Sequence, residues 1–311
     1  MSQKFWNYGY SILLSIILLL LIGIFITWNG NEYQNESSTI TNNKSVEESI
    51  LVKDEQVVEK ERIIFLYDLI EQKNKELQLF NQYVEERKKE EGKVKVAIII
   101  DDMGYQKEMA DLIMNLNFPV TVSVLPFLPY SQYVAQLAKE KGITVLLHLP
   151  MEPHNSNVDP GRGAIFSTMS EQEIRNKFLA DWLDIPYISG VNNHMGSKIT
   201  ENRDIMKIIL SEIKEKNLFF IDSMTSPDSV GYQLSKEMGI KTAQRTVFLD
   251  NEQDVDYIRN QIKILKEYAL KYGSAIAIGH PYCNTIDMLI EADLILQSEG
   301  IEIVPLKELL E

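Results

Sequence analysis

The feature that most constrains this chain is a regular alternation of short apolar runs and longer helical patterns, which begins near Lys95 and continues to the end of the sequence. The apolar runs have the length and composition of strands buried on both faces, and the segments between them have the apolar spacing of amphipathic helices. This alternation predicts parallel strands joined by right-handed crossovers. About seven or eight such units over roughly 215 residues favour a distorted or incomplete (β/α) barrel, and an open doubly wound sheet is the alternative.

The expected strands and helices follow one another without long gaps. The strands are predicted at 96–101, 120–125, 144–148, 190–194, 218–222, 241–245, 275–280 and 302–305. The helices are predicted near 107–116, 131–141, 170–182, 202–216, 229–238, 254–272 and 285–298. Ser170 and Glu173 have the spacing of a capping box at the start of one helix. Neither a dinucleotide-binding glycine motif nor a P-loop motif occurs, so those chemistries have no support in the sequence.

Composition narrows the possible partners and cofactors. The chain has 31 basic and 45 acidic residues, a formal net charge of −14, which argues against a nucleic-acid partner. A single cysteine, Cys283, excludes a disulfide framework, a cysteine-based zinc finger and an iron–sulfur cluster. Only four histidines are present. Any metal site must therefore combine a few histidines with carboxylates.

An apolar N-terminal segment predicts a membrane anchor within residues 1–28. The 19 residues from Tyr10 to Trp28 carry no charge and would form about 28 Å of helix, close to the thickness of a bilayer core. Aromatic residues flank the run and Lys4 precedes it, which is typical of a helix with its basic end in the cytoplasm. The rest of the chain would then be extracytoplasmic. A cleaved signal peptide, which would give a secreted form, is the alternative, but the apolar run is long and no small-x-small site follows it.

Two segments separate this anchor from the alternating region. Residues 29–46 are rich in polar residues and predict a flexible linker. Residues 47–92 are rich in Glu, Lys, Gln and Leu, with apolar residues at the a and d positions of a heptad frame, which predicts a long amphipathic helix. This helix could self-associate as a coiled coil or pack on its own protein. The folded domain is expected over residues 93–311.

Rare polar residues lie at the ends of the expected strands. They are Asp101, Asp102, His148, His194, Asp222 and His280. The carboxyl ends of parallel barrel strands meet at one mouth, so we expect several of these side chains at one cavity. Adjacent strand residues point to opposite faces, and Asp101 and Asp102 can share the site only if the strand ends there. The Met-Gly pair that follows permits a bend at this point.

This set of residues is suited to metal-assisted hydrolysis. Two neutral imidazoles and one carboxylate can hold a divalent ion and leave positions open for water and substrate. Such an ion lowers the pKa of its bound water and polarises a carbonyl, while a second carboxylate takes the proton and another histidine protonates the leaving group. Each residue also has a structural interpretation. The Asp pair or Asp222 could cap a turn or helix, and the histidines could be buried structural side chains.

Seven stretches, in this order, resemble the divergent polysaccharide deacetylase family, a branch of the NodB-like carbohydrate esterases. They are AIIIDDMGY, TVSVLP, LLHLPMEP, NNHMGS, FFIDSMTS, RTVFLDN and IGHP, and they span about Val96 to Pro305. The resemblance implies a distorted (β/α) barrel and a divalent metal, usually zinc. It also implies that the substrate is a polysaccharide from which an N- or O-acetyl group is hydrolysed.

The resemblance can be carried over to individual residues. Asp102 matches the metal-binding aspartate of the superfamily and Asp101 its general base. His280 matches the late catalytic histidine, and His148 and His194 would be the metal-ligand histidines. Other deacetylases of the superfamily take both histidines from one short H-x-x-x-H-like motif, whereas here they come from different strands. The Arg-Pro motif of the superfamily has no clear counterpart.

Other residues near the expected mouth are secondary candidates. Asp222 is a further catalytic candidate at the end of the fifth strand. The loop 151–166 is expected to rim the site, and Arg162 in this loop is a candidate substrate contact. Asn193, which precedes His194, is another.

These observations leave three functional hypotheses. The first is a membrane-anchored, metal-dependent deacetylase of an envelope glycan. The second is a glycan-binding or scaffold protein that keeps the barrel without catalysis, and the third is a metal-dependent hydrolase of another bond. The joint presence of two adjacent aspartates and three strand-end histidines favours an active site over a scaffold. It does not distinguish the bond that is cleaved.

Overall fold

The structure is a computed structural model that describes Lys75 and residues 94–311. The predicted anchor, the linker and, apart from Lys75, the predicted amphipathic helix lie outside the described residues. None of the described helices combines the length and the apolar character that a membrane crossing requires.

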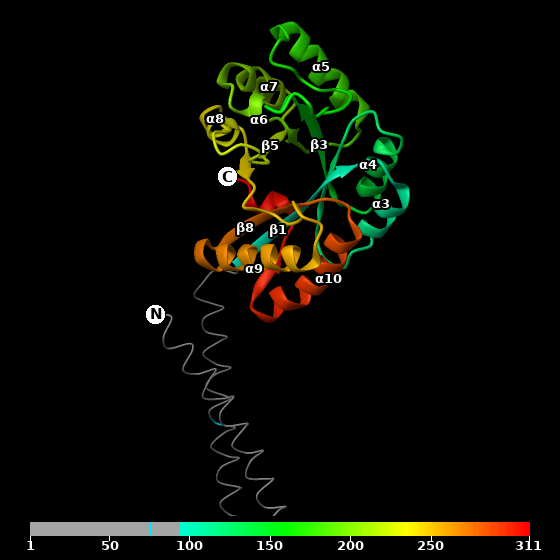
Figure 1. Ribbon diagram of the computed structural model, residues 1–311, viewed down its shortest axis with the longest axis vertical. Coiled ribbons are helices and arrows are strands. Elements are labelled where there is room, and N and C mark those ends of the chain that lie inside the picture. The colour runs from blue at the N-terminus through cyan, green and yellow to red at the C-terminus, as the bar shows by residue number, and fades with distance from the viewer. Residues whose placement is uncertain (1–74, 76–93) are drawn as a thin grey trace, which may run out of the picture. The chain divides into compact units, whose positions relative to one another are not determined.

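The described chain alternates strands and helices, with the helices arranged around the strands (Figure 1). The strands are β1 (Val94–Met103), β2 (Thr121–Val124), β3 (Thr144–Met151), β4 (Gly190–Met195), β5 (Phe219–Asp222), β6 (Thr242–Gln244), β7 (Val247–Phe248), β8 (Ser274–Gly279) and β9 (Ile301–Ile303). The helices are α3 (Lys107–Ile113), α4 (Ser131–Glu140), α5 (Glu171–Asp184), α6 (Ser197–Thr200), α7 (Arg203–Glu215), α8 (Gly231–Glu237), α9 (Val255–Tyr272), α10 (Cys283–Ser298) and the 3₁₀ helix η1 (Leu306–Leu309).

The strands form one parallel sheet whose order follows the chain cyclically. The path is β6-β5-β4-β3-β2-β1-β8-β7, and β9 pairs with the first residues of β1. A doubly wound sheet would reverse its strand order at a switch point, and this path contains no reversal. The two ends of the path, β6 and β7, are not paired with each other. The prediction of an incomplete (β/α) barrel is therefore confirmed.

Alternating strand residues build two apolar layers. Val96, Ile98 and Ile100 of β1 belong to the large core that includes residues of the helices. Ala97 and Ile99, on the opposite face of β1, belong to a smaller cluster of strand residues closed by Leu306 of η1. This second cluster is the barrel interior, because a strand buried on both faces presents one set of residues to the helices and the other to the inside.

The interior becomes polar toward the carboxyl ends of the strands. Continuing along the inward faces, His148 follows Leu146, which belongs to the interior cluster. Asp101 follows Ile99 in the same way. Asp101 and His148 are both 2% exposed. The barrel interior is therefore apolar at the level of Ile99 and Leu146 and polar, though still buried, nearer the carboxyl ends of the strands.

Most predicted elements are present, with several differences: β3 continues to Met151, three residues past its predicted end, and the short helix η1 was not expected. The capping box of Ser170 and Glu173 is present at the start of α5. Strand β1 does not end at Asp101 but continues to Met103. Strand β7 and helix α6 were not expected, because two and four residues respectively are too few for a periodic pattern.

Candidate metal centre and active site

An irregularity in β1 brings both adjacent aspartates to the site. Ile100 pairs with Val122 and Met103 with Val124, so β1 has one more residue than β2 over this interval, as in a β-bulge. Asp102 has a φ of 55°, a left-handed conformation that costs energy for a residue with a side chain. This local change of backbone conformation interrupts the alternation of side-chain direction along β1, so that Asp102 does not point away from Asp101. The strand therefore does not end at the aspartates, as the sequence argument required, and the bulge at this point brings both side chains to the site instead.

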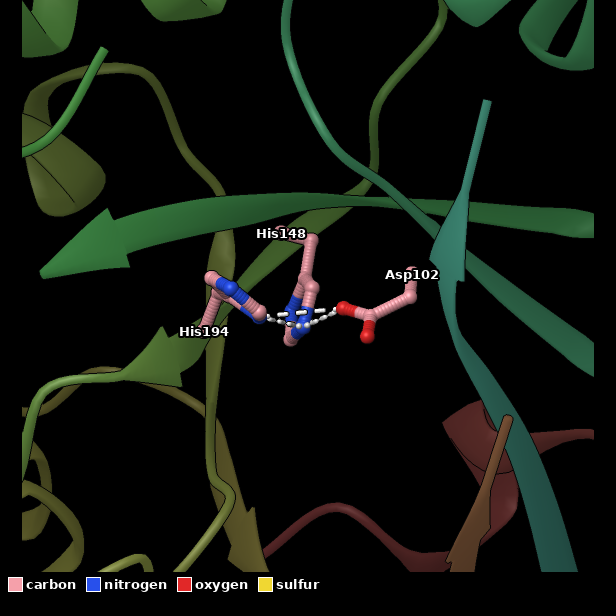
Figure 2. A group of neighbouring side chains, drawn as sticks. All are labelled: Asp102, His148 and His194. Atoms are coloured by element: carbon pink, nitrogen blue, oxygen red, sulfur yellow. Dashed lines mark hydrogen bonds and ion pairs between the residues drawn. The ribbon is translucent and has the colours of Figure 1, made fainter. Parts of the chain in front are cut away.

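Three predicted ligands converge in this layer (Figure 2). Asp102 Oδ1 lies 3.2 Å from His148 Nε2 and 3.0 Å from His194 Nδ1. The two nitrogens are 3.1 Å apart. His148 is held on β3 and His194 on β4, and the backbone register places them near one another because Pro150 pairs with His194. The three atoms thus form a nearly equilateral triangle built from β1, β3 and β4, with β2 lying between β1 and β3 in the sheet.

The triangle fits a divalent metal ion. Tetrahedral zinc sites with bonds of about 2.0–2.1 Å place their ligand atoms about 3.3 Å apart. Asp102 Oδ1 is buried, and its near neighbours are the two imidazole nitrogens at 3.2 and 3.0 Å. Among the described residues no group donates to it in regular hydrogen-bond geometry, although buried oxygens in proteins nearly always accept such a bond. Two imidazole nitrogens and one unpaired carboxylate oxygen are the donor set expected for zinc or a similar ion.

Asp101 lies next to the His148 corner of this triangle. Its Oδ2 is 3.6 Å from His148 Nε2, and its Oδ1 accepts a hydrogen bond of 2.9 Å from Asn192 Nδ2. Burial raises the pKa of Asp101, while the charges of His148 and His280 and the Asn192 hydrogen bond oppose this rise. A carboxylate with a raised pKa is a better proton acceptor than a free aspartate, as a general base requires.

His280 approaches the triangle from β8. The Nε2 atom of His280 lies 3.9 Å from Asp102 Oδ2. The carboxylate of Asp250 lies 2.8 Å from His280 Nδ1 and accepts a hydrogen bond of 2.7 Å from the backbone N–H of His280. Burial of the ring lowers the pKa of His280, but the hydrogen bond and charge of Asp250, together with Asp101 and Asp102, raise it to about 9. His280 is therefore charged near neutral pH and can donate a proton.

The structure adds residues that the sequence reasoning missed. Asp250 pairs with His280, Asn192 joins Asp101 to His148, and Arg245 donates from Nε and one terminal nitrogen to the carbonyls of Ser223 and Met224, each at 2.7 Å. Burial lowers the pKa of Arg245 to about 10, and the carboxylates of Asp222 and Asp101 oppose this effect. Asp250 and Arg245 both lie in the RTVFLDN stretch, which was matched to the family without a role for either residue.

Asp222 has the alternative, structural role. It is fully buried, and it accepts hydrogen bonds from the backbone N–H groups of Met224 and Tyr232, both at 2.9 Å, and from Ser229 Oγ at 2.6 Å. The reason is the alternation of side-chain direction along β5. Ile221 points into the barrel, so Asp222 points outward, toward the start of α8. The catalytic expectation for Asp222 finds no support in this geometry, which instead makes it a cap.

Asn193 and Arg162, the two predicted substrate contacts, do not belong to the triangle. Asn193 donates to the Met195 carbonyl at 2.8 Å and accepts from Ser223 N–H at 2.9 Å, so its amide ties the end of β4 to the segment that follows β5. The guanidinium of Arg162 stacks 4.5 Å from the centre of the Phe127 ring. The side chain of Arg162 is exposed, which leaves it accessible to a ligand at the rim.

Comparisons with known proteins agree with this architecture. The family model described as divergent polysaccharide deacetylase matches residues 98–310. An uncharacterized protein of Haemophilus influenzae is 36% identical over 210 residues, covering 68% of this chain and 74% of that protein. The uncharacterized protein YibQ of Escherichia coli strain K12 is 35% identical over 195 residues, covering 63% of this chain and 61% of that protein.

A solved structure supports the fold. The uncharacterized protein ATU2773 from Agrobacterium tumefaciens C58 superposes with a TM-score of 0.66 at 21% identity, covering 70% of this chain and 89% of that one. The family match covers residues 98–310, nearly all of the described barrel, and includes every residue of the triangle. The chain belongs to the divergent polysaccharide deacetylase family.

Proposed function

We propose that this protein is a metal-dependent hydrolase that removes acetyl groups from a polysaccharide of the cell envelope. The observation that carries the proposal is the triangle of Asp102, His148 and His194, with a buried carboxylate, Asp101, and a charged histidine, His280, beside it. A protein that only binds glycans has no need for a buried carboxylate oxygen that faces two imidazole nitrogens and accepts no regular hydrogen bond from the described residues. The arrangement supports hydrolysis over a scaffold role.

Asp102, His148 and His194 would hold the metal, and zinc suits this donor set best. When bound, a divalent ion supplies Lewis acidity toward a carbonyl oxygen and lowers the pKa of water. The protein itself contributes the rigid placement of the three ligand atoms. His148 and His194 lie on adjacent parallel strands, and the bulge in β1 sets the direction of Asp102.

Asp101 would take the proton from the attacking water. Its carboxylate is buried beside the triangle, and Asn192 holds one oxygen so that the other faces His148. The water oxygen would form a bond to the acetyl carbon. Collapse of the resulting tetrahedral centre would break the bond between that carbon and the nitrogen or oxygen of the sugar.

His280 would supply the proton to the departing group. Asp250 holds its Nδ1 and keeps the ring charged, so Nε2 carries the transferable proton. After both transfers the products are acetate and a free amine or hydroxyl on the glycan. Asp101 and His280 would thus act as a base and acid pair on two sides of the ligand triangle.

We also propose that residues 1–28 anchor the protein in the membrane and that the barrel acts on the outer side of it. The basis is the uncharged run of residues 10–28 and its agreement with a polysaccharide substrate in the envelope. Cleavage of this segment would give a secreted form with the same activity.

The first experiment is elemental analysis of the purified full-length protein beside the double variant Asp102→Ala/His148→Ala. We expect about one zinc or similar ion per chain in the natural protein and none in the variant. Acetate release from acetylated envelope glycans would then be measured with and without a chelator. A natural protein that neither contains nor takes up metal would overturn the hydrolase proposal and favour the scaffold hypothesis.

A further inference from the structure

Asn192 lies at the centre of a buried hydrogen-bond network in the polar layer. Its side chain is fully buried on β4. The amide oxygen is 2.9 Å from His148 Nδ1 and also accepts from Ser123 Oγ. The amide nitrogen donates to Asp101 Oδ1 at 2.9 Å and to Ser223 Oγ at 3.2 Å. One amide therefore uses both of its oxygen lone pairs and both of its N–H groups.

The partners determine which way the amide points. Asn192 Nδ2 lies within hydrogen-bond distance of two oxygens, Asp101 Oδ1 and Ser223 Oγ, and donates to both. The NH₂ group of Asn192 therefore faces Asp101, and its oxygen faces His148. An amide oxygen cannot donate, so His148 Nδ1 must carry the proton of that contact.

This arrangement selects one tautomer of His148. With the proton on Nδ1, the lone pair of a neutral ring is on Nε2, and Nε2 is the atom in the triangle with Asp102 and His194. Histidines that bind metals usually donate their other ring N–H to a fixed acceptor, which sets both tautomer and ring orientation. For His148 that acceptor is a neutral amide, whereas for His280 it is a carboxylate, Asp250.

We propose that Asn192 is a positioning residue that couples the two halves of the site, by fixing the Nδ1–H tautomer of His148 with its oxygen and orienting Asp101 with its nitrogen. The consequence for metal affinity rests on the proposed function. The tautomer itself does not, because the hydrogen bonds involve only this chain. The adjacent Asn193 cannot substitute, since its amide is bound to the Met195 carbonyl at the end of β4 and to the Ser223 N–H after β5.

The tautomer can be measured directly by NMR. The chain has only four histidines, so ¹⁵N-histidine labelling of the full-length, chelator-treated protein gives four ring systems, and a His148→Gln variant identifies the signals of His148. At a pH where this ring is neutral, we expect a protonated Nδ1 and an unprotonated Nε2. In Asn192→Leu, which removes all four hydrogen bonds at similar volume, the Nδ1–H state should no longer predominate.

Metal affinity and a second variant separate the two functions of the amide. Zinc affinity, measured by chelator competition, should fall about 10–100-fold in Asn192→Leu. Asn192→Asp keeps acceptors for His148 and Ser123 but loses the donors to Asp101, so it should retain the tautomer even if the leucine variant does not fold. Thr242→Val is the matched control, because it removes a buried hydrogen bond to the Phe220 carbonyl without touching the network. It should lower the melting temperature and leave His148 and zinc affinity unchanged.

The outcomes distinguish this inference from the proposed function. A protonated Nε2 in the natural protein, a tautomer unaffected in Asn192→Leu, or a tautomer lost in Asn192→Asp would overturn the inference. A tautomer that depends on Asn192 in a protein that binds no zinc would uphold the inference and overturn the metal-dependent activity. Zinc affinity that changes as much in Thr242→Val as in Asn192→Leu would reduce Asn192 to a purely structural residue.

Discussion

Near their carboxyl ends β1 and β5 carry similar residues, Asp101–Asp102 and Asp222–Ser223, but use them in opposite ways. In β1 the bulge turns Asp102 toward the residues that Asp101 also approaches, so both carboxylates serve the site. In β5 the alternation is regular, and Asp222 points toward α8.

The comparison shows how backbone conformation decides the role of a strand-end aspartate. Asp222 receives three hydrogen bonds and stabilises the turn after β5. Asp102 Oδ1 receives none from the described residues and lies between two imidazole nitrogens. A satisfied carboxylate is suited to structure, and an unsatisfied one with a strained backbone is suited to binding a ligand.

Removing the unsatisfied carboxylate should have the largest effect. Asp102→Ala eliminates one ligand of three, so zinc affinity should fall by more than about 100-fold, beyond the effect expected for a residue that only supports a ligand. Elemental analysis and chelator competition measure this loss. Asp222→Asn should retain a full complement of metal. Equal metal loss in the two variants would contradict the assignment of roles.

The second prediction separates the two aspartates of β1. Asp101→Asn should keep the metal but reduce acetate release by about 10²–10⁴-fold, the usual contribution of a general base. The reason is that an amide cannot accept the proton from water. Metal content and circular dichroism serve as controls for folding. Full activity in this variant would remove Asp101 as the base.

A third prediction concerns the acid on β8. The pKa of His280 is about 9, so activity should decline as the pH rises through this value and His280 loses its proton. Asp250→Asn removes the charge that raises this pKa and should move the alkaline limb of the pH–activity profile down by about one unit or more. An unchanged alkaline limb would show that another group controls it.

A fourth prediction addresses the structural role of Asp222. Asp222→Asn places an NH₂ group against donors that now bond to a carboxylate, and it should destabilise the domain by roughly 1–3 kcal/mol. Thermal unfolding should record a decrease of about 2–4 °C for each kcal/mol. Asp228→Asn, on an exposed part of the same loop, is the control and should have little effect.

The last prediction concerns a buried aspartate to which no group of the described residues donates a hydrogen bond. Asp181 on α5 is fully buried beneath Gly163, and both its oxygens lack partners among the described residues. Burial raises its pKa to about 8, with Lys177 opposing and Asp184 adding to the shift. An unfolded aspartate has a pKa of about 3.9. Between these two values the native state holds a proton that the unfolded state releases, so stability falls as the pH rises.

Asp181→Asn should remove this pH-dependent loss. The variant and the natural protein should unfold at similar temperatures near pH 4. Near pH 8 the variant should be more stable by at least about 1 kcal/mol, or roughly 2–4 °C. Asp228→Asn again provides the control. A constant difference between Asp181→Asn and the natural protein across this range would show that Asp181 does not hold a proton in the native state.

Much of the fold was predictable because it depends on local periodicity. The strand–helix alternation specified the parallel barrel, and the Ser170–Glu173 spacing specified a cap that is present. Strand β7 was not predictable, because two residues carry no period. The pairing of Asp250 with His280 depends on that strand, since β7 lies beside β8 and leads the chain toward His280.

The sequence by itself determined which rare polar residues lie at strand ends, and parallel strands deliver their carboxyl ends to one mouth whatever the details of packing. Asp102, His148 and His194 are among these residues, the resemblance to the family suggests them as metal ligands, and the structure brings the three together. Only the tertiary structure decided which of two adjacent residues faces the barrel interior. In β1 both Asp101 and Asp102 do so. In β4 it is Asn192 and not Asn193, and at the end of β5 it is Ser223 and not Asp222. The physical reason is that side-chain direction alternates with every residue, so a single bulge or a shift of register reverses it.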